Sequence, residues 1–202
     1  MRYWLAMELA GTIVHDGNGG VRDDLTTPAG LAGWLHAQAA LLSELPGLDD
    51  VTVDERLRSE VVGVRTAVRA LFARMVSPGP PSRADAGRLP APDDALAQLN
   101  RVAGRAPVTV TLDWPADGAP RIRMAGTEAA AGPAGLLTSA LARAAIAFLA
   151  DPDSQQLAAC SAPRCVRYFL KEHGRQEYCK PSCSNRARAA RHYQRHHDET
   201  TR

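Results

Sequence analysis

The four cysteines of this chain are concentrated in one short segment near its C-terminus. They are Cys160, Cys165, Cys179 and Cys183, with the spacing C-x4-C-x13-C-x3-C. Two close pairs suit a tetrahedral ion, because each pair can chelate from one turn and the intervening chain returns to close the site. We therefore predict one zinc ion per chain, held by these four thiolates. Four thiolates leave no open position for water, so this zinc is expected to be structural rather than catalytic.

Other uses of these cysteines are less consistent with the sequence. Two disulfides would require an oxidising compartment, which nothing in the chain supports, and four unrelated buried cysteines would rarely cluster this closely. Histidine ligands are another alternative, because His192 and His196 have the spacing of a zinc-finger helix, but Cys183 lies too close to them and Cys165 too far. A zinc site that responds to oxidation stays open as an alternative.

A four-cysteine site needs a turn at each pair and a scaffold between the pairs. Val166–Leu170 is apolar and aromatic, Gly174 offers a flexible turn, and Glu177–Tyr178 lead back to the third cysteine, which predicts a hairpin. Pro181 suits the first turn of a helix, which places Cys183 in that turn. Knuckle, hairpin and helix follow one another as in a treble-clef zinc module.

The predicted helix after the last cysteine carries a row of arginines. At about 100° per residue, one face holds Asn185, Arg188, Arg191 and Arg195, together with Ser184 and His192. Arg186 falls on the opposite face, where it is expected to pack against the module or pair with an acid. Guanidinium groups in a row, with an asparagine at the helix start, suit contacts to phosphates and base edges. The alternative is a solvated face whose charges only aid solubility.

The distribution of charge suggests a nucleic-acid or other anionic partner for the C-terminal segment, and a solvated, highly charged C-terminus is an equal alternative on charge alone. Residues 1–159 hold 14 Lys/Arg against 18 Asp/Glu, whereas residues 160–202 hold 10 Lys/Arg against 4 Asp/Glu. An acidic body with a basic tail is typical of proteins that bind an anionic partner.

Periodicity predicts a mainly α fold, with a helical domain over residues 1–150 and the zinc module over residues 151–202. Helices are expected from Thr27-Pro28, from Asp54 to Met75 with a capping box of Thr52 and Glu55, over Asp93–Val102, and over Gly135–Ala150. One hairpin is expected, with strands Val108–Trp114 and Arg121–Met124 around an Asp-Gly turn. The stretches 15–24 and 77–92 are rich in turn residues and are expected to be loops.

The sequence predicts neither a membrane segment nor an enzyme. The apolar stretch Leu136–Ala150 contains Arg143 and is short for a span, and Glu8 interrupts the apolar N-terminus. A cytoplasmic location is therefore expected. The chain shows no glycine-rich phosphate loop, no nucleophile elbow and no nucleophile–base constellation, so we do not expect catalysis.

The motifs resemble those of the CGNR zinc finger family, whose members pair an N-terminal ABATE domain with a C-terminal zinc module. The resemblance rests on Cys160–Leu170 and on YC-x3-CSNR from Tyr178 to Arg186, where Ser184 replaces the usual glycine. Upstream, MELAGT at Met7–Thr12 and LTTPAGLAGWL from Leu25 resemble two ABATE motifs. Glu8 and Gly11 stand where an aspartate and an asparagine are usual.

The resemblance implies a bacterial transcription regulator linked to stress responses. Our first hypothesis is a regulator that binds DNA through the zinc module, with DNA favoured over RNA. The N-terminal domain would then sense an unidentified small-molecule effector or form a homodimer. The second hypothesis is an adaptor whose zinc module docks protein, and an RNA-binding protein is a third.

Overall fold

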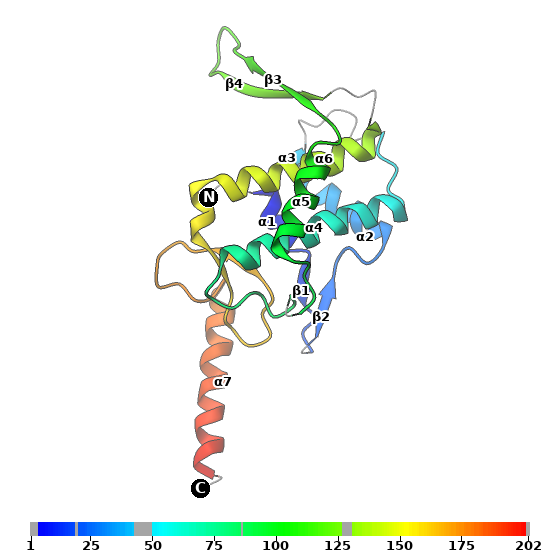
Figure 1. The fold of residues 1–202 in the computed structure, drawn as a ribbon. Helices are drawn as coiled ribbons and strands as arrows, with labels where there is room; N and C mark the ends of the chain where they lie inside the picture. Colours follow the sequence, from blue (N-terminus) through cyan, green and yellow to red (C-terminus); the bar gives the residue numbers. More distant parts are fainter. Residues whose placement is uncertain (1–3, 19, 43–49, 86, 127–130, 201–202) are drawn as a thin grey trace.

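The structure is a computed structural model of the chain, and it describes residues 4–18, 20–42, 50–85, 87–126 and 131–200. The mainly α architecture is confirmed, since helices form the body and the described strands pair into three two-stranded antiparallel sheets. Helix α7 (Pro181–Thr200) and the predicted hairpin of β3 (Val108–Asp113) and β4 (Arg121–Gly126) project from opposite ends of the body (Figure 1).

The body is built around one long helix, α4 (Glu55–Met75). It packs against α1 (Leu5–Ala10), α2 (Pro28–Ala37), α5 (Pro92–Ala103) and α6 (Gly132–Ala150). The buried residues of α4 include Leu57, Val61, Val64, Val68 and Leu71, at the spacing that defines one helix face, whereas Met75 is exposed. The short helix α3 (Ala39–Leu42) follows α2.

Side-chain caps set the starts of α2 and α4. Thr27 caps α2 as predicted, because its Oγ1 accepts a hydrogen bond from the backbone N–H of Gly30 at 3.1 Å. The predicted capping box of Thr52 and Glu55 is wrong. Asp54 is the N-cap of α4, and its Oδ1 accepts from the N–H of Leu57 at 2.8 Å, which satisfies one of the unpaired donors of the first turn.

The stretch from His15 to Asp24, expected to be a loop, forms a hairpin of β1 (Ile13–His15) and β2 (Val21–Asp23). Asp16 closes its turn, because its Oδ1 accepts from the N–H groups of Asn18 at 2.8 Å and Gly20 at 2.9 Å. The strands have three residues each, which is too short for an alternating pattern to stand out in the sequence.

One hydrophobic core joins the body to the cysteine-rich segment. Phe72 of α4 stacks edge-on with Phe148 of α6 at 5.3 Å between ring centroids and with Tyr168 at 5.5 Å. Leu157 belongs to the same buried cluster. The cysteine-rich segment therefore packs on the body through its own apolar side chains.

Helix α6 is long and apolar enough to cross a membrane by length and composition, with a mean hydropathy of 1.5. Its Leu137, Leu141 and Phe148 are nevertheless almost fully buried in the protein, and the helix packs against α4 and α5. We therefore interpret α6 as a core helix.

Candidate metal centre

The four cysteines converge on one point, as their spacing predicts. Their Sγ atoms all lie within 4.8 Å of one another, with 3.8 Å between Cys165 and Cys179 and 3.6 Å between Cys179 and Cys183. A zinc ion bound by four thiolates at the usual bond length needs sulfur atoms about 3.8 Å apart. The donor set and its size therefore fit one structural Zn²⁺.

The first pair of cysteines lies in a knuckle between two short strands. β5 (Leu157–Ala159) pairs with β6 (Tyr168–Leu170), and between them the N–H of Cys165 donates to the carbonyl of Ala162 at 3.1 Å. The expected pairing of Val166–Leu170 with Glu177–Tyr178 is wrong. The knuckle itself turns the chain back, so the strand after it meets the strand before it.

The second pair joins the returning chain to the start of α7. The N–H of Cys183 donates to the carbonyl of Lys180 at 3.0 Å in the first helical turn, as Pro181 predicts. The N–H of Cys179 points to the Sγ of Cys160 at 3.4 Å, and the carbonyl of Glu177 accepts from the N–H of Ser161 at 3.3 Å. The returning segment therefore docks on the knuckle rather than on β6.

Electrostatics at the cluster also fit a bound dication. Hydrogen bonds from the thiols of Cys165 and Cys179 lower the pKa of Cys160 to about 3. The same close contacts raise the pKa of Cys179, because neighbouring sulfurs compete for one proton. Four thiols at this distance do not all ionise by themselves, because the negative charges repel one another. A bound Zn²⁺ offsets this repulsion and favours the thiolate at each position.

Histidine does not take part in the described cluster. Among the side chains that the structure describes, the metal-binding group consists of the four cysteines. His192 is exposed on α7, and the side chain of His196 lies outside the described residues.

Arg186 faces the zinc site from α7, as the helical projection predicts. Its Nη2 donates to the Sγ of Cys183 at 3.2 Å, and the side chain is half-buried. Four thiolates carry more negative charge than one dication neutralises. The guanidinium therefore compensates part of the excess and holds the orientation of a ligand.

Replacing Arg186 by methionine is expected to weaken zinc retention by about 10- to 100-fold, the usual effect of losing a group that supports a metal ligand. Competition with a chromophoric chelator measures this loss. Arg188→Met is the matched control, because Arg188 is exposed on the same helix and donates to Asn185 rather than to a cysteine sulfur. Equal zinc affinity in both variants would contradict a role for Arg186 at the site.

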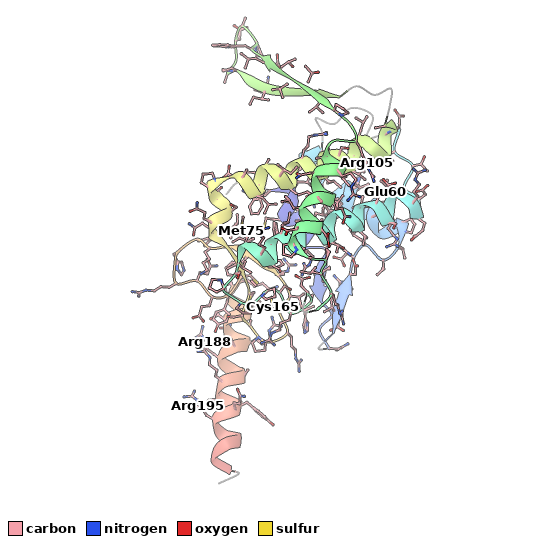
Figure 2. The ribbon with its side chains drawn as sticks, viewed as in Figure 1. Glu60, Met75, Arg105, Cys165, Arg188 and Arg195 are labelled. Carbon is pink, nitrogen blue, oxygen red and sulfur yellow. The ribbon has the colours of Figure 1, made fainter. Side chains whose placement is uncertain are left out.

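Helix α7 places the predicted basic residues on one exposed side. Asn185, Arg188, Arg191 and Arg195 are exposed, whereas Cys183 and Ala187 are buried. Figure 2 shows Arg188 and Arg195 on the part of α7 that extends from the body. Arg188 donates to the Oδ1 of Asn185 at 3.2 Å, and Arg191 donates to the hydroxyl of Tyr178 at 3.1 Å, which ties the row of arginines to the chain beside Cys179.

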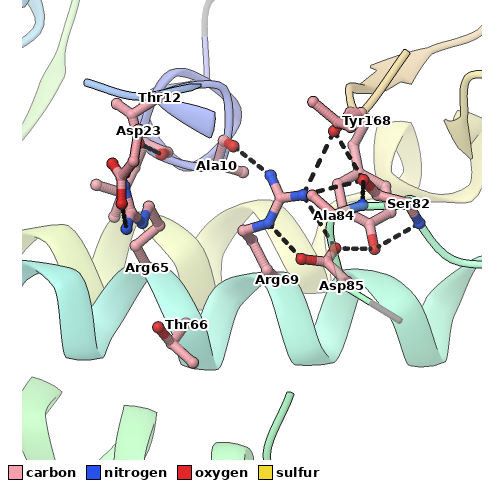
Figure 3. A network of polar contacts seen from close by, with 12 residues as sticks. Ala10, Thr12, Asp23, Arg65, Thr66, Arg69, Ser82, Ala84, Asp85 and Tyr168 are labelled. Atoms are coloured by element: carbon pink, nitrogen blue, oxygen red, sulfur yellow. Dashed lines mark hydrogen bonds and ion pairs between the residues drawn. The ribbon is translucent and has the colours of Figure 1, made fainter. Parts of the chain in front are cut away.

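A buried ionic network, which the sequence did not reveal, fastens the zinc module to α4 (Figure 3). Arg69 is 1% exposed, and its Nε and Nη2 donate to the carboxylate of Asp85 at 2.8 Å and 3.0 Å. The hydroxyl of Tyr168 donates to the same carboxylate at 2.8 Å, and Ser82 donates to the carbonyl of Val166 at 2.8 Å. Burial, together with the charge of Asp85, raises the pKa of Tyr168, so its hydroxyl stays a donor.

Comparison with known protein families matches both parts of the chain. Residues 4–152 match ABATE, described as a "putative stress-induced transcription regulator", and residues 156–196 match the CGNR zinc finger. The chain belongs to the ABATE family. Among curated proteins, none matches it. Both resemblances seen in the sequence are thus confirmed, and the CGNR zinc finger of this ABATE protein holds one structural Zn²⁺ between its four cysteines.

Proposed function

We propose that this ABATE protein is a transcriptional regulator that binds DNA through its CGNR zinc finger, with α7 as the contact surface. One observation carries the proposal. An exposed face of arginines extends along a helix whose first turn is held by the zinc site.

The geometry of α7 supports contact with a phosphate backbone. The helix has 20 residues and projects away from the body, so a duplex can approach its exposed side (Figure 1). Arg188, Arg191 and Arg195 follow one another at intervals of three and four residues, which places their guanidinium groups along one track. Asn185 lies at the start of the same face, where an amide can reach a base edge.

In this proposal the protein acts in the cytoplasm by binding and not by catalysis. A zinc ion held by four thiolates offers no position for substrate or water. The helical domain then serves as the unit that senses an effector or joins two copies of the chain.

Replacing Arg188, Arg191 and Arg195 together by alanine is expected to weaken binding to random duplex DNA. Each arginine that contacts a phosphate releases a counterion, so the slope of log K against log salt should fall by about 1 per contact. Fluorescence anisotropy across a salt series measures both quantities. Asn185→Ala should instead change the preference between sequences more than the overall affinity.

The matched control replaces Arg56, Arg74 and Arg101, which are exposed on α4 and α5, and removes the same charge. Unchanged affinity and slope in the α7 variant, with zinc still bound, would refute the proposal and favour the protein adaptor. Tighter, arginine-dependent binding to single-stranded RNA would favour the RNA alternative.

A further inference from the structure

A cavity of about 420 Å³ lies where the helical domain meets the zinc module. Three separate segments line it, namely Met7–Thr12 in and after α1, the region from Asp24 to α2, and β6 with the chain that follows it. These are the segments that carry the family motifs MELAGT, LTTPAGLAGWL and YFL. The volume falls within the usual range for small-molecule sites.

Aromatic rings form much of the cavity wall. Trp4, Trp34 and Phe169 line it, from the N-terminus, from α2 and from β6 respectively. Trp4 is held edge-on against Phe148 at 5.3 Å, and Phe169 is buried in the small core around the cysteines. The rings are therefore positioned by packing on either side of the cavity and do not depend on a ligand for their placement.

The charged groups at the cavity are mostly negative. Glu8, Asp24 and Glu172 line it, against Arg167. Asp24 pairs with Arg22 at 2.9 Å, whereas half-buried Glu8 forms no ion pair with a described residue. Cys179 also lines the cavity, and as a zinc ligand it adds negative potential on that side.

We propose that this cavity binds a small organic cation, an ammonium group attached to an apolar body. Aromatic faces attract a cation through their quadrupole, and a carboxylate adds a charge-assisted hydrogen bond. Glu8 is the main anionic partner, and the half-buried Trp34 is the main ring partner. Because the walls belong to both the helical domain and the zinc module, such a ligand stabilises the contact between them by mass action.

Tryptophan fluorescence tests the proposal directly on the zinc-loaded protein. Trp114 is 67% exposed on the distant hairpin, so a Trp114→Phe background leaves Trp4 and Trp34 as reporters. The probes are 2-phenylethylamine, the neutral 2-phenylethanol and the anionic 3-phenylpropionate, which share one apolar body. Saturable binding is expected in the order amine, then alcohol, then acid. Failure of the amine to bind, or equal affinity for amine and alcohol, would overturn the proposal.

Two variants locate the site. Glu8→Gln keeps the shape of the side chain and should weaken amine binding by about 10-fold or more, without affecting the alcohol. Trp34→Leu should weaken it by about 2- to 5-fold, measured by calorimetry with thermal unfolding as the check of folding.

Asp117→Asn, an exposed acid in the turn between β3 and β4, is the matched control and should have no effect. Equal loss in Glu8→Gln and Asp117→Asn would refute the assignment. Binding of the amine is measured without nucleic acid, so the outcome does not depend on the proposed function.

Discussion

Cys183→Ser is expected to abolish zinc binding and to unfold the cysteine-rich segment. Cys183 is fully buried, and a serine hydroxyl does not ionise to replace its thiolate. The small core around the site consists of Cys160, Ala162, Cys165, Phe169 and Cys183, so four of the five residues have little apolar surface to bury. Structural zinc sites supply on the order of 10 kcal/mol of binding free energy to modules of this size.

Hydrogen exchange combined with metal analysis measures this result. Amides of β6, of the chain up to Cys183 and of the first turns of α7 should lose protection, in the variant and equally after chelation of the parent protein. Amides in the centre of α4, which packs against several helices of the body, should keep their protection.

Ser182→Ala is the matched control, since Ser182 is exposed in the same helical turn. One zinc per chain in Cys183→Ser, or full protection of β6 after chelation, would contradict a zinc-dependent fold.

Much of the metal site was predictable because a chelate constrains sequence spacing directly. Two cysteines on one turn must be close in the chain, so C-x4-C and C-x3-C indicate the ligands without knowledge of the fold. The helices that hold the site were predictable for a similar local reason, since Thr27-Pro28 and the apolar repeat from Leu57 act within a few residues.

Strand pairing around the site was not predictable in the same way. Val166–Leu170 looks like half of a hairpin, but its partner, Leu157–Ala159, has no β-branched residue and precedes the knuckle. The turn that joins them is the knuckle that contains Cys160 and Cys165, and it has no Asn-Gly or Asp-Gly sequence of the kind that marks a hairpin turn. A strand that pairs through a metal-bound turn therefore lacks the pattern used to recognise hairpins.

The Arg69–Asp85 pair is a second feature that the sequence did not predict. Its partners are 16 residues apart, and the loop between them is rich in proline and glycine, so no period relates them. One signal was nevertheless available, because Arg65 and Arg69 recur at four-residue spacing among the buried positions of α4. An arginine on the apolar face of a core helix indicates a buried acid, since an unpaired guanidinium is costly to bury.

Asp85→Ala is accordingly expected to lower the free energy of unfolding by about 3–5 kcal/mol, the cost of leaving one partner of a buried ion pair uncompensated. The substitution removes the carboxylate that pairs with Arg69 and accepts from the hydroxyl of Tyr168, and both of these side chains are buried. Urea denaturation measures the change, and the melting temperature should fall by on the order of 10 °C for a chain of this length.

Asp93→Ala provides the comparison within the same protein. Asp93 pairs with Arg74 of α4 at 3.4 Å, but its side chain is 93% exposed, so solvent screening limits the expected loss to about 1 kcal/mol or less. If Asp85→Ala and Asp93→Ala had the same free energy of unfolding, the buried network would not fasten the zinc module to α4. If Asp85→Ala alone is destabilised and also loses protection in β6, the Asp85 carboxylate links β6 to α4, because it pairs with Arg69 and accepts from the hydroxyl of Tyr168.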